Sequence, residues 1–104
     1  MKISTTLLAV LLAAGVSAPA FASQALATSK GCLGCHKTDV KLVGPSYQDV
    51  AAKYAGQKGA EAALAEKMMK GSSGVWGPAA MPPNPGLSAD DAKTLAKWAL
   101  SGGK

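Results

Sequence analysis

Bulky aliphatic side chains are scarce beyond residue 22, and this scarcity limits what the chain can fold into. The 82 residues from Ser23 to Lys104 contain seven leucines, four valines and neither isoleucine nor phenylalanine. These residues make up about 13% of the segment, below the roughly 20% at which a chain struggles to form a core. Much of the remaining apolar content is alanine, which buries little surface. A domain of this size usually gains the missing stability from disulfides, a metal or a cofactor.

The first 22 residues have the pattern of a secretory signal peptide. Lys2 is followed by an apolar run over residues 7–16 and then by the small-residue sequence AFA at 20–22. A membrane anchor needs about 20 apolar residues to cross a bilayer, and this run is half that length. We therefore expect residues 1–22 to be a signal peptide that is removed after Ala22, and we expect no permanent membrane anchor.

The size and charge of the remaining segment exclude several classes of protein. Its length allows one small domain, which excludes a large multidomain enzyme. Ten lysines and six acidic residues give it a formal charge of +4, and these charges are dispersed along the chain. Such a modest and scattered charge does not indicate a nucleic-acid-binding protein.

Both cysteines and the only histidine of the chain fall in one motif, Cys32-Leu33-Gly34-Cys35-His36. This spacing lets two thiols form thioethers with the two vinyl groups of one porphyrin, while the adjacent imidazole binds the iron. Burying several hundred Å² of porphyrin would contribute on the order of 10 kcal/mol, comparable to the whole stability of a small domain. The motif therefore indicates covalently attached heme, and we expect the heme-free chain to be largely unfolded.

Three other interpretations of the cysteines explain less. A structural zinc site would have three of its usual four ligands here and no second cluster to complete it. A thioredoxin-like pair would follow a strand, and the chain has no run of alternating β-branched residues. A disulfide between such close neighbours closes a very short loop and leaves the deficient core unexplained.

Three methionines of the domain are candidates for the second iron ligand, because the chain has no other histidine. Met68 falls on the apolar stripe of an expected helix and is interpreted as a core residue, whereas Met69 is expected to face solvent. Met81 precedes two prolines in a loop, and proline stiffens the extended chain that would hold its thioether against a metal. We therefore expect Met81 to be the second iron ligand, with Met68 or an open site as the alternatives. A site with His/Met ligation suits electron transfer, because it leaves no position for substrate.

Helical periodicity predicts three helices. The clearest runs from Ser88, with Asp91 completing a short capping box, to about Ser101. Others are expected over residues 60–70 and about 46–54, the last of these after Gly44-Pro45. The helical signal is weak over residues 24–32, because Gly31 and Gly34 oppose it. Residues 71–86 are rich in Gly, Pro and Ser and predict a loop that is long enough to be functional.

The chain resembles the small bacterial class I monoheme cytochromes c of the c-551/c-552 type. The likeness covers residues 23–104, through KGCLGCH, VGPSYQDVAAKYAGQ, GVWGPAAMPPN and DAKTLAKW. It implies that residues 23–104 are a cytochrome c domain with an all-α fold, in which four or five short helices wrap around one covalently bound heme c. It also implies that Cys32 and Cys35 hold the heme, and that His36 and Met81 are the axial ligands.

The resemblance implies roles for further residues. The Pro45 carbonyl would accept the ring N–H of the axial histidine, and Asn84 would donate toward the methionine sulfur. Trp76 and Lys67 would face a heme propionate, although some family members carry arginine at the position of Lys67. An apolar docking patch would ring the exposed heme edge, formed by Leu33, Leu42, Val43, Pro78, Ala79, Ala80, Pro82 and Pro83.

The sequence thus predicts a periplasmic, monomeric electron shuttle that is not an enzyme. Its partners would be redox proteins such as a nitrite reductase, a terminal oxidase, a peroxidase or a membrane cytochrome donor, and its lysines would steer it to acidic surfaces. A small peroxidase or gas-binding heme protein is the second hypothesis, and it requires an open or displaceable sixth iron position. The third is a binding module with zinc or a disulfide at the cysteines, which would be colourless.

Overall fold

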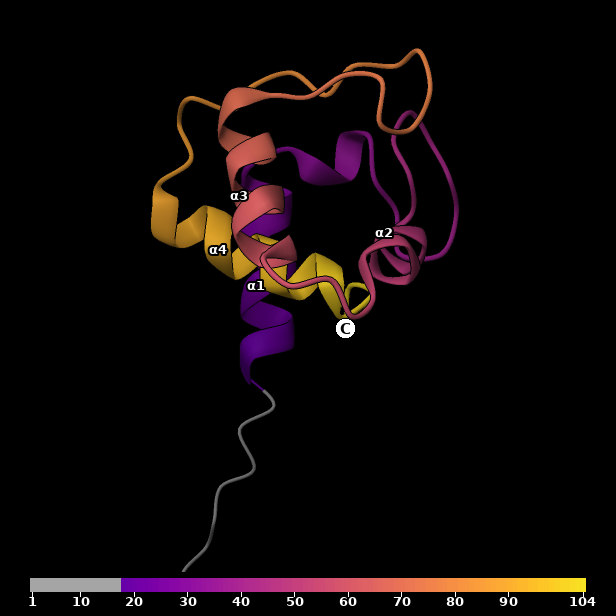
Figure 1. Ribbon diagram of the computed structural model, residues 1–104. Helices are drawn as coiled ribbons and strands as arrows, with labels where there is room; N and C mark the ends of the chain where they lie inside the picture. Colours follow the sequence, from indigo (N-terminus) through magenta and orange to yellow (C-terminus); the bar gives the residue numbers. More distant parts are fainter. Residues whose placement is uncertain (1–17) are drawn as a thin grey trace, which may run out of the picture.

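The computed structural model describes residues 18–104, which form four α-helices and one short 3-10 helix (Figure 1). In chain order these are α1 (Ala18–Ser29), η1 (Cys32–Gly34), α2 (Tyr47–Tyr54), α3 (Ala60–Lys70) and α4 (Ala89–Leu100). Within this range the only β-structure is two isolated bridges, so the predicted all-α fold is confirmed. None of the described helices is long and apolar enough to cross a membrane. The apolar run of the predicted signal peptide, residues 7–16, lies outside the described residues.

Helix α4 is the element against which the other three α-helices pack. It begins as its sequence predicts, because the Ser88 hydroxyl caps it by accepting the Asp91 N–H at 3.1 Å. Its buried face carries the predicted apolar stripe, in which Leu95 is 2% exposed and Ala92 and Ala96 are fully buried. In Figure 1, α4 runs beneath α3, and α1 lies behind it.

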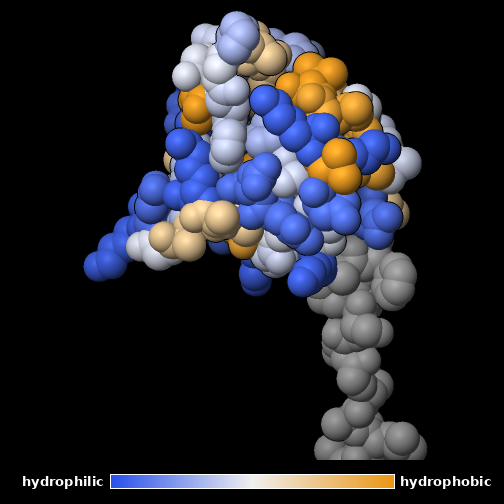
Figure 2. Space-filling view, turned by 90° about the vertical axis from the view of Figure 1, so that its right-hand side faces the viewer, coloured by the Kyte–Doolittle hydropathy of each residue, from blue (hydrophilic) through white to orange (hydrophobic). Residues whose placement is uncertain are grey.

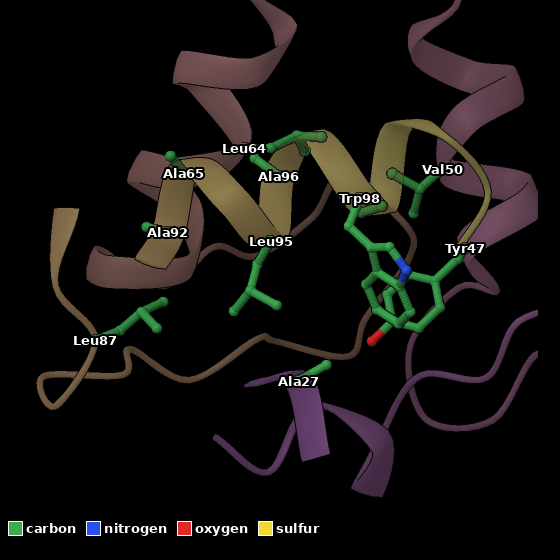
Figure 3. Close-up of a cluster of buried hydrophobic side chains, with 11 residues drawn as sticks. Ala27, Tyr47, Val50, Leu64, Ala65, Leu87, Ala92, Leu95, Ala96 and Trp98 are labelled. Atoms are coloured by element: carbon green, nitrogen blue, oxygen red, sulfur yellow. The ribbon is translucent and has the colours of Figure 1, made fainter. Parts of the chain in front are cut away.

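Alanine is the most frequent residue in the buried core. Five of the eleven residues in the main buried cluster are alanines, and Figure 3 shows the cluster arranged around α4. Its largest members, Tyr47 and Trp98, pack with ring centroids 4.6 Å apart and planes tilted by 57°. This composition agrees with the shortage of aliphatic residues in the sequence.

Helices α2 and α3 lie where the periodicity places them. The Ser46 hydroxyl caps α2 by accepting the Asp49 N–H at 3.1 Å. Helix α3 covers residues 60–70 as predicted, and Glu66 and Lys70, four residues apart, form an ion pair at 2.9 Å on its exposed face.

One helix is more regular than its sequence signal indicates, and one expectation needs correction. The weak signal before the first cysteine conceals a regular helix, α1, whose Ala27 is completely buried in the core cluster and is therefore stabilised by tertiary packing. Met69 was expected to face solvent, but its side chain is half-buried and packs against the core cluster. Both methionines in the C-terminal turn of α3, Met68 and Met69, thus pack against the core cluster.

The predicted loop over residues 71–86 contains no helix or strand and arches over one end of the helices (Figure 1). Beneath it runs the segment that joins α1 to α2. Ser72 and Met81 form an antiparallel bridge that pins the loop near the end of α3. Between the two segments lies the cavity described next.

Candidate functional site

A cavity of about 470 Å³ lies between the α1–α2 connection and the 71–86 loop. Its volume falls in the range of pockets that hold small molecules and cofactors. The wall includes both cysteines and the histidine of the motif, together with side chains from α2, α3 and α4. Eight residues that the sequence assigned to heme and iron line it: Cys32, Cys35, His36, Pro45, Lys67, Trp76, Met81 and Asn84.

The cysteine motif forms a compact turn. Cys32, Leu33 and Gly34 form η1, and the Cys32 carbonyl accepts the N–H groups of both Cys35 (3.2 Å) and His36 (3.0 Å). This turn places the two thiols and the imidazole on one cavity wall. Both thiols are free and half-buried, and burial raises the pKa of the Cys32 thiol above its ordinary value.

Two contacts fix the imidazole of His36. Its Nδ1 lies 2.7 Å from the Pro45 carbonyl oxygen, and because a carbonyl only accepts, Nδ1 carries the proton and donates. Its ring stacks on Tyr47, with centroids 5.6 Å apart and planes 29° from parallel. This tautomer leaves Nε2 unprotonated, which is the state that a metal requires.

Gly44 lies against the His36 ring, a contact that the sequence did not indicate. A β-carbon on Gly44 would lie 2.5 Å from His36 Cε1 and 2.9 Å from Nδ1, closer than β-carbons normally approach other atoms. The Gly44 N–H also donates to the Cys35 carbonyl at 2.8 Å. Only glycine therefore allows this segment to pack directly on the imidazole.

Met81 enters the cavity wall from the loop, beside the end of α3. Its backbone exchanges two hydrogen bonds with Ser72, at 2.8 and 3.0 Å. Met68 also lines the cavity, from α3, whereas Met69 does not. The wall thus offers two thioethers, of which only Met81 lies on an extended segment followed by prolines.

Lysine and aromatic side chains line another part of the cavity wall. Lys67 Nζ lies 3.4 Å from the Tyr54 hydroxyl, and both residues face the cavity. Trp76 lines the cavity while remaining 36% exposed, and Lys53 Nζ lies 5.1 Å from the centroid of its indole. Lysine and indole N–H are donors suited to a carboxylate such as a propionate.

Asn84 is tied to the segment that precedes the cysteine motif. Its Nδ2 donates to the Lys30 carbonyl at 3.2 Å, and Lys30 Nζ donates to the Gly86 carbonyl at 3.2 Å. The side-chain amide keeps a second hydrogen after this bond. Donation from Asn84 toward the sulfur of Met81 stays a prediction.

The expected docking residues are mostly exposed. Val43 is 57% exposed and Leu42 48%, whereas Leu33 is half-buried and packs against the core cluster. Val40, which the sequence did not single out, is 60% exposed and adds to the apolar surface of the connection between α1 and α2. Figure 2 faces the side that carries α2 and shows hydrophobic residues among hydrophilic ones. The other expected patch residues are also exposed: Pro78, Ala79, Ala80, Pro82 and Pro83.

The residues present fit a heme. The wall combines the two thiols, an imidazole with a free Nε2, and thioethers, which together suit heme attachment and iron binding. The indole N–H of Trp98, another wall residue, is buried and has no hydrogen-bond partner among the described residues. Between residues 18 and 104, no three His, Cys, Asp or Glu side chains are grouped to hold a metal ion, so the zinc interpretation finds no complete ligand set.

Comparison with known proteins agrees with this site. The sequence model of the cytochrome c family matches residues 22–102. The chain is 60% identical over 78 residues to cytochrome c-551 of Pseudomonas aeruginosa, covering 75% of this chain and 74% of the relative. It is 52% identical to cytochrome c-552 of Hydrogenobacter thermophilus, covering 91% of this chain and 93% of the relative.

A solved structure gives the same result for the fold. The crystal structure of wild-type cytochrome c552 from Nitrosomonas europaea superimposes with a TM-score of 0.73 at 49% identity. The match covers 75% of this chain and 96% of that protein. With the Cys32, Cys35 and His36 motif lining a cavity of suitable size, the chain belongs to the cytochrome c family, whose small c-551/c-552 members carry electrons on one covalently attached heme.

Proposed function

We propose that this protein carries single electrons in the periplasm, with its heme iron bound by His36 and Met81. The observation that supports this most is the cavity wall, where the two thiols, the oriented imidazole and the Met81 segment occur together. The Pro45 hydrogen bond and the Tyr47 stack hold the imidazole in one orientation, so Nε2 is the nitrogen that would bind iron.

The proposed ligand pair determines the role. When bound, heme supplies a one-electron couple between Fe(II) and Fe(III). The neutral thioether of Met81 favours Fe(II) and raises the reduction potential. Because His36 and Met81 would together hold the iron, oxygen, peroxide or another substrate would have no iron position to enter. This property favours an electron carrier over a small peroxidase or gas-binding protein.

We further propose that residues 1–22 are removed on export. The Lys2, apolar run and AFA order supports this, as does the match of the cytochrome c model from residue 22 onward. Removal would leave Ser23, which lies inside α1, as the new N-terminus.

The docking surface would be the apolar patch predicted above, which we extend by Val40. Leu42 and Val43 are exposed, as are Lys37 and Lys41 in the same connection between α1 and α2. Apolar side chains flanked by cations suit a partner with an apolar contact site and an acidic rim. Such a partner would be a redox protein of the kinds already named, and the shuttle would act as a monomer.

Three methionine variants of the holoprotein test the proposed ligand. Met81→Ala should abolish the far-red sulfur-to-iron band of the ferric protein, lower the midpoint potential and allow imidazole or carbon monoxide to bind. Met69→Ala is the matched control, because Met69 is half-buried but does not line the cavity. Met68→Ala tests the other wall thioether and should retain the band.

The results distinguish the hypotheses. Loss of the band in Met68→Ala with retention in Met81→Ala would assign the ligand to α3. Carbon monoxide binding by the unsubstituted protein would favour an enzyme or gas sensor. A purified, folded protein without visible absorbance would refute heme attachment altogether.

A further inference from the structure

Gly71 lies where α3 ends and the loop that carries Met81 begins. Its N–H donates to the Lys67 carbonyl at 2.8 Å and thereby closes the last turn of the helix. Its backbone has φ 83° and ψ 169°, a conformation that is essentially restricted to glycine. The direction in which the chain leaves α3 therefore depends on this residue.

The backbone of the Met81 segment packs directly on Gly71. A β-carbon on Gly71 would lie 2.8 Å from the Met81 carbonyl oxygen, 3.0 Å from Pro83 N and 3.1 Å from Pro83 Cδ. These are backbone and proline-ring atoms, which cannot swing aside as the end of a flexible side chain can. Any other residue at this position would push the loop away from the helix.

Three backbone hydrogen bonds tie this same segment to the end of α3. Ser72 and Met81 exchange two, and the Asn84 N–H donates to the Met68 carbonyl at 3.0 Å. The last bond satisfies a carbonyl at the helix C-terminus that has no partner within the helix. Met81 is thus itself one attachment point and Asn84 is the second, and the spacing between loop and helix is set at Gly71.

We infer that Gly71 is a positioning residue for the Met81 thioether. By lacking a β-carbon, it lets the Met81 backbone lie against the end of α3, and this fixes the point from which the side chain enters the cavity. The inference rests on the proposed axial role of Met81. Gly71 itself does not line the cavity, so it acts through the loop and not by contact with a bound group.

The test compares Gly71→Ala holoprotein with two controls. Gly59→Ala also places a β-carbon at a positive φ, 77°, at the other end of α3, but that β-carbon would meet nothing within 4 Å. Leu100→Ala truncates a side chain that packs against the core cluster without lining the cavity, and it controls for general loss of stability. Measurements are the ferric far-red band per heme, the midpoint potential and the imidazole concentration that gives half-saturation.

We expect Gly71→Ala to lose at least half of the band intensity, to have a lower potential and to bind imidazole at a concentration at least tenfold lower than the unsubstituted protein. Both controls should change imidazole binding less than twofold. In a Met81→Ala background, Gly71→Ala should no longer alter imidazole binding, because the thioether that it displaces is absent. Band intensity and imidazole binding in Gly71→Ala equal to those of Gly59→Ala would overturn the inference.

A second variant covers the case in which Gly71→Ala yields no holoprotein. Ser72→Pro removes the N–H that donates to the Met81 carbonyl, and it should weaken the band in the same direction. An unchanged band in Ser72→Pro would then overturn the inference. Absence of the band from the unsubstituted protein would instead refute the axial role of Met81, and the role of Gly71 with it, so the two failures are distinguishable.

Discussion

Preventing heme attachment should unfold most of this domain. The double variant Cys32→Ala/Cys35→Ala cannot form thioethers, and in the heme-free double variant the cavity of about 470 Å³ would have to be closed or filled with water. At about 24 cal/mol per Å³, a void of that size costs on the order of 11 kcal/mol. This is an upper bound, because exposed residues such as Trp76 line part of the wall and water can enter. It still matches the 5–15 kcal/mol that stabilises a typical domain.

The assay compares the exported double variant with the holoprotein by far-ultraviolet circular dichroism and by thermal and urea unfolding. We expect little helix and no cooperative transition in the double variant. Cys35→Ala, which keeps one thiol for attachment, is the control and should remain helical and coloured. A colourless double variant with native helix content and a cooperative transition would refute the reasoning, since the alanine-rich side chains alone would then form a sufficient core.

Three further predictions test other parts of the site. Gly44→Ala should displace the imidazole and lower both the holoprotein yield and the thermal midpoint of unfolding. Gly34→Ala is the control and should change both much less, because its β-carbon would meet nothing within 4 Å. Equal losses in the two variants would contradict the close contact at Gly44. Lys67→Met should lower the midpoint potential by the equivalent of less than about 1 kcal/mol, because removing a nearby cation favours Fe(III). In the same redox titration, Lys70→Met should leave the midpoint potential unchanged. Leu42→Asn should slow electron transfer to a redox partner in stopped-flow mixing without changing the potential, because Leu42 is exposed and does not line the cavity. An unchanged rate would place the docking surface elsewhere.

Features that depend on neighbouring residues in the chain were predictable from the sequence. The cap at Ser88 and Asp91, the limits of α3 and the attachment motif all lie within short windows where local hydrogen bonds or thioether spacing decide the outcome. The loop over 71–86 was predictable for the same reason, because glycine and proline act on their own backbone. The heme site could be assigned because most of its chemistry falls in five consecutive residues.

Features that arise from the approach of distant segments were not predictable. Helix α1 has a weak local signal and owes its order to the burial of Ala27. Gly44 and Gly71 look like ordinary turn glycines in the sequence, and their importance comes from the His36 ring and the Met81 backbone that pack on them. Met69 was misplaced because helical periodicity gives an angle around the axis but not how much of the circumference the neighbouring elements cover.

The alanines on α4 set distances as well as filling space. Ala92 and Ala96 are fully buried on the helix against which α1 and α3 pack, and Ala27 is fully buried in the same cluster from α1 (Figure 3). Such short side chains let helix axes approach closely, so a valine at either α4 position would wedge its neighbours outward. The distances between these helices therefore depend on the alanines. Graded substitution at these positions offers a way to shift Leu95, Trp98 and Ala99, which line the cavity from α4.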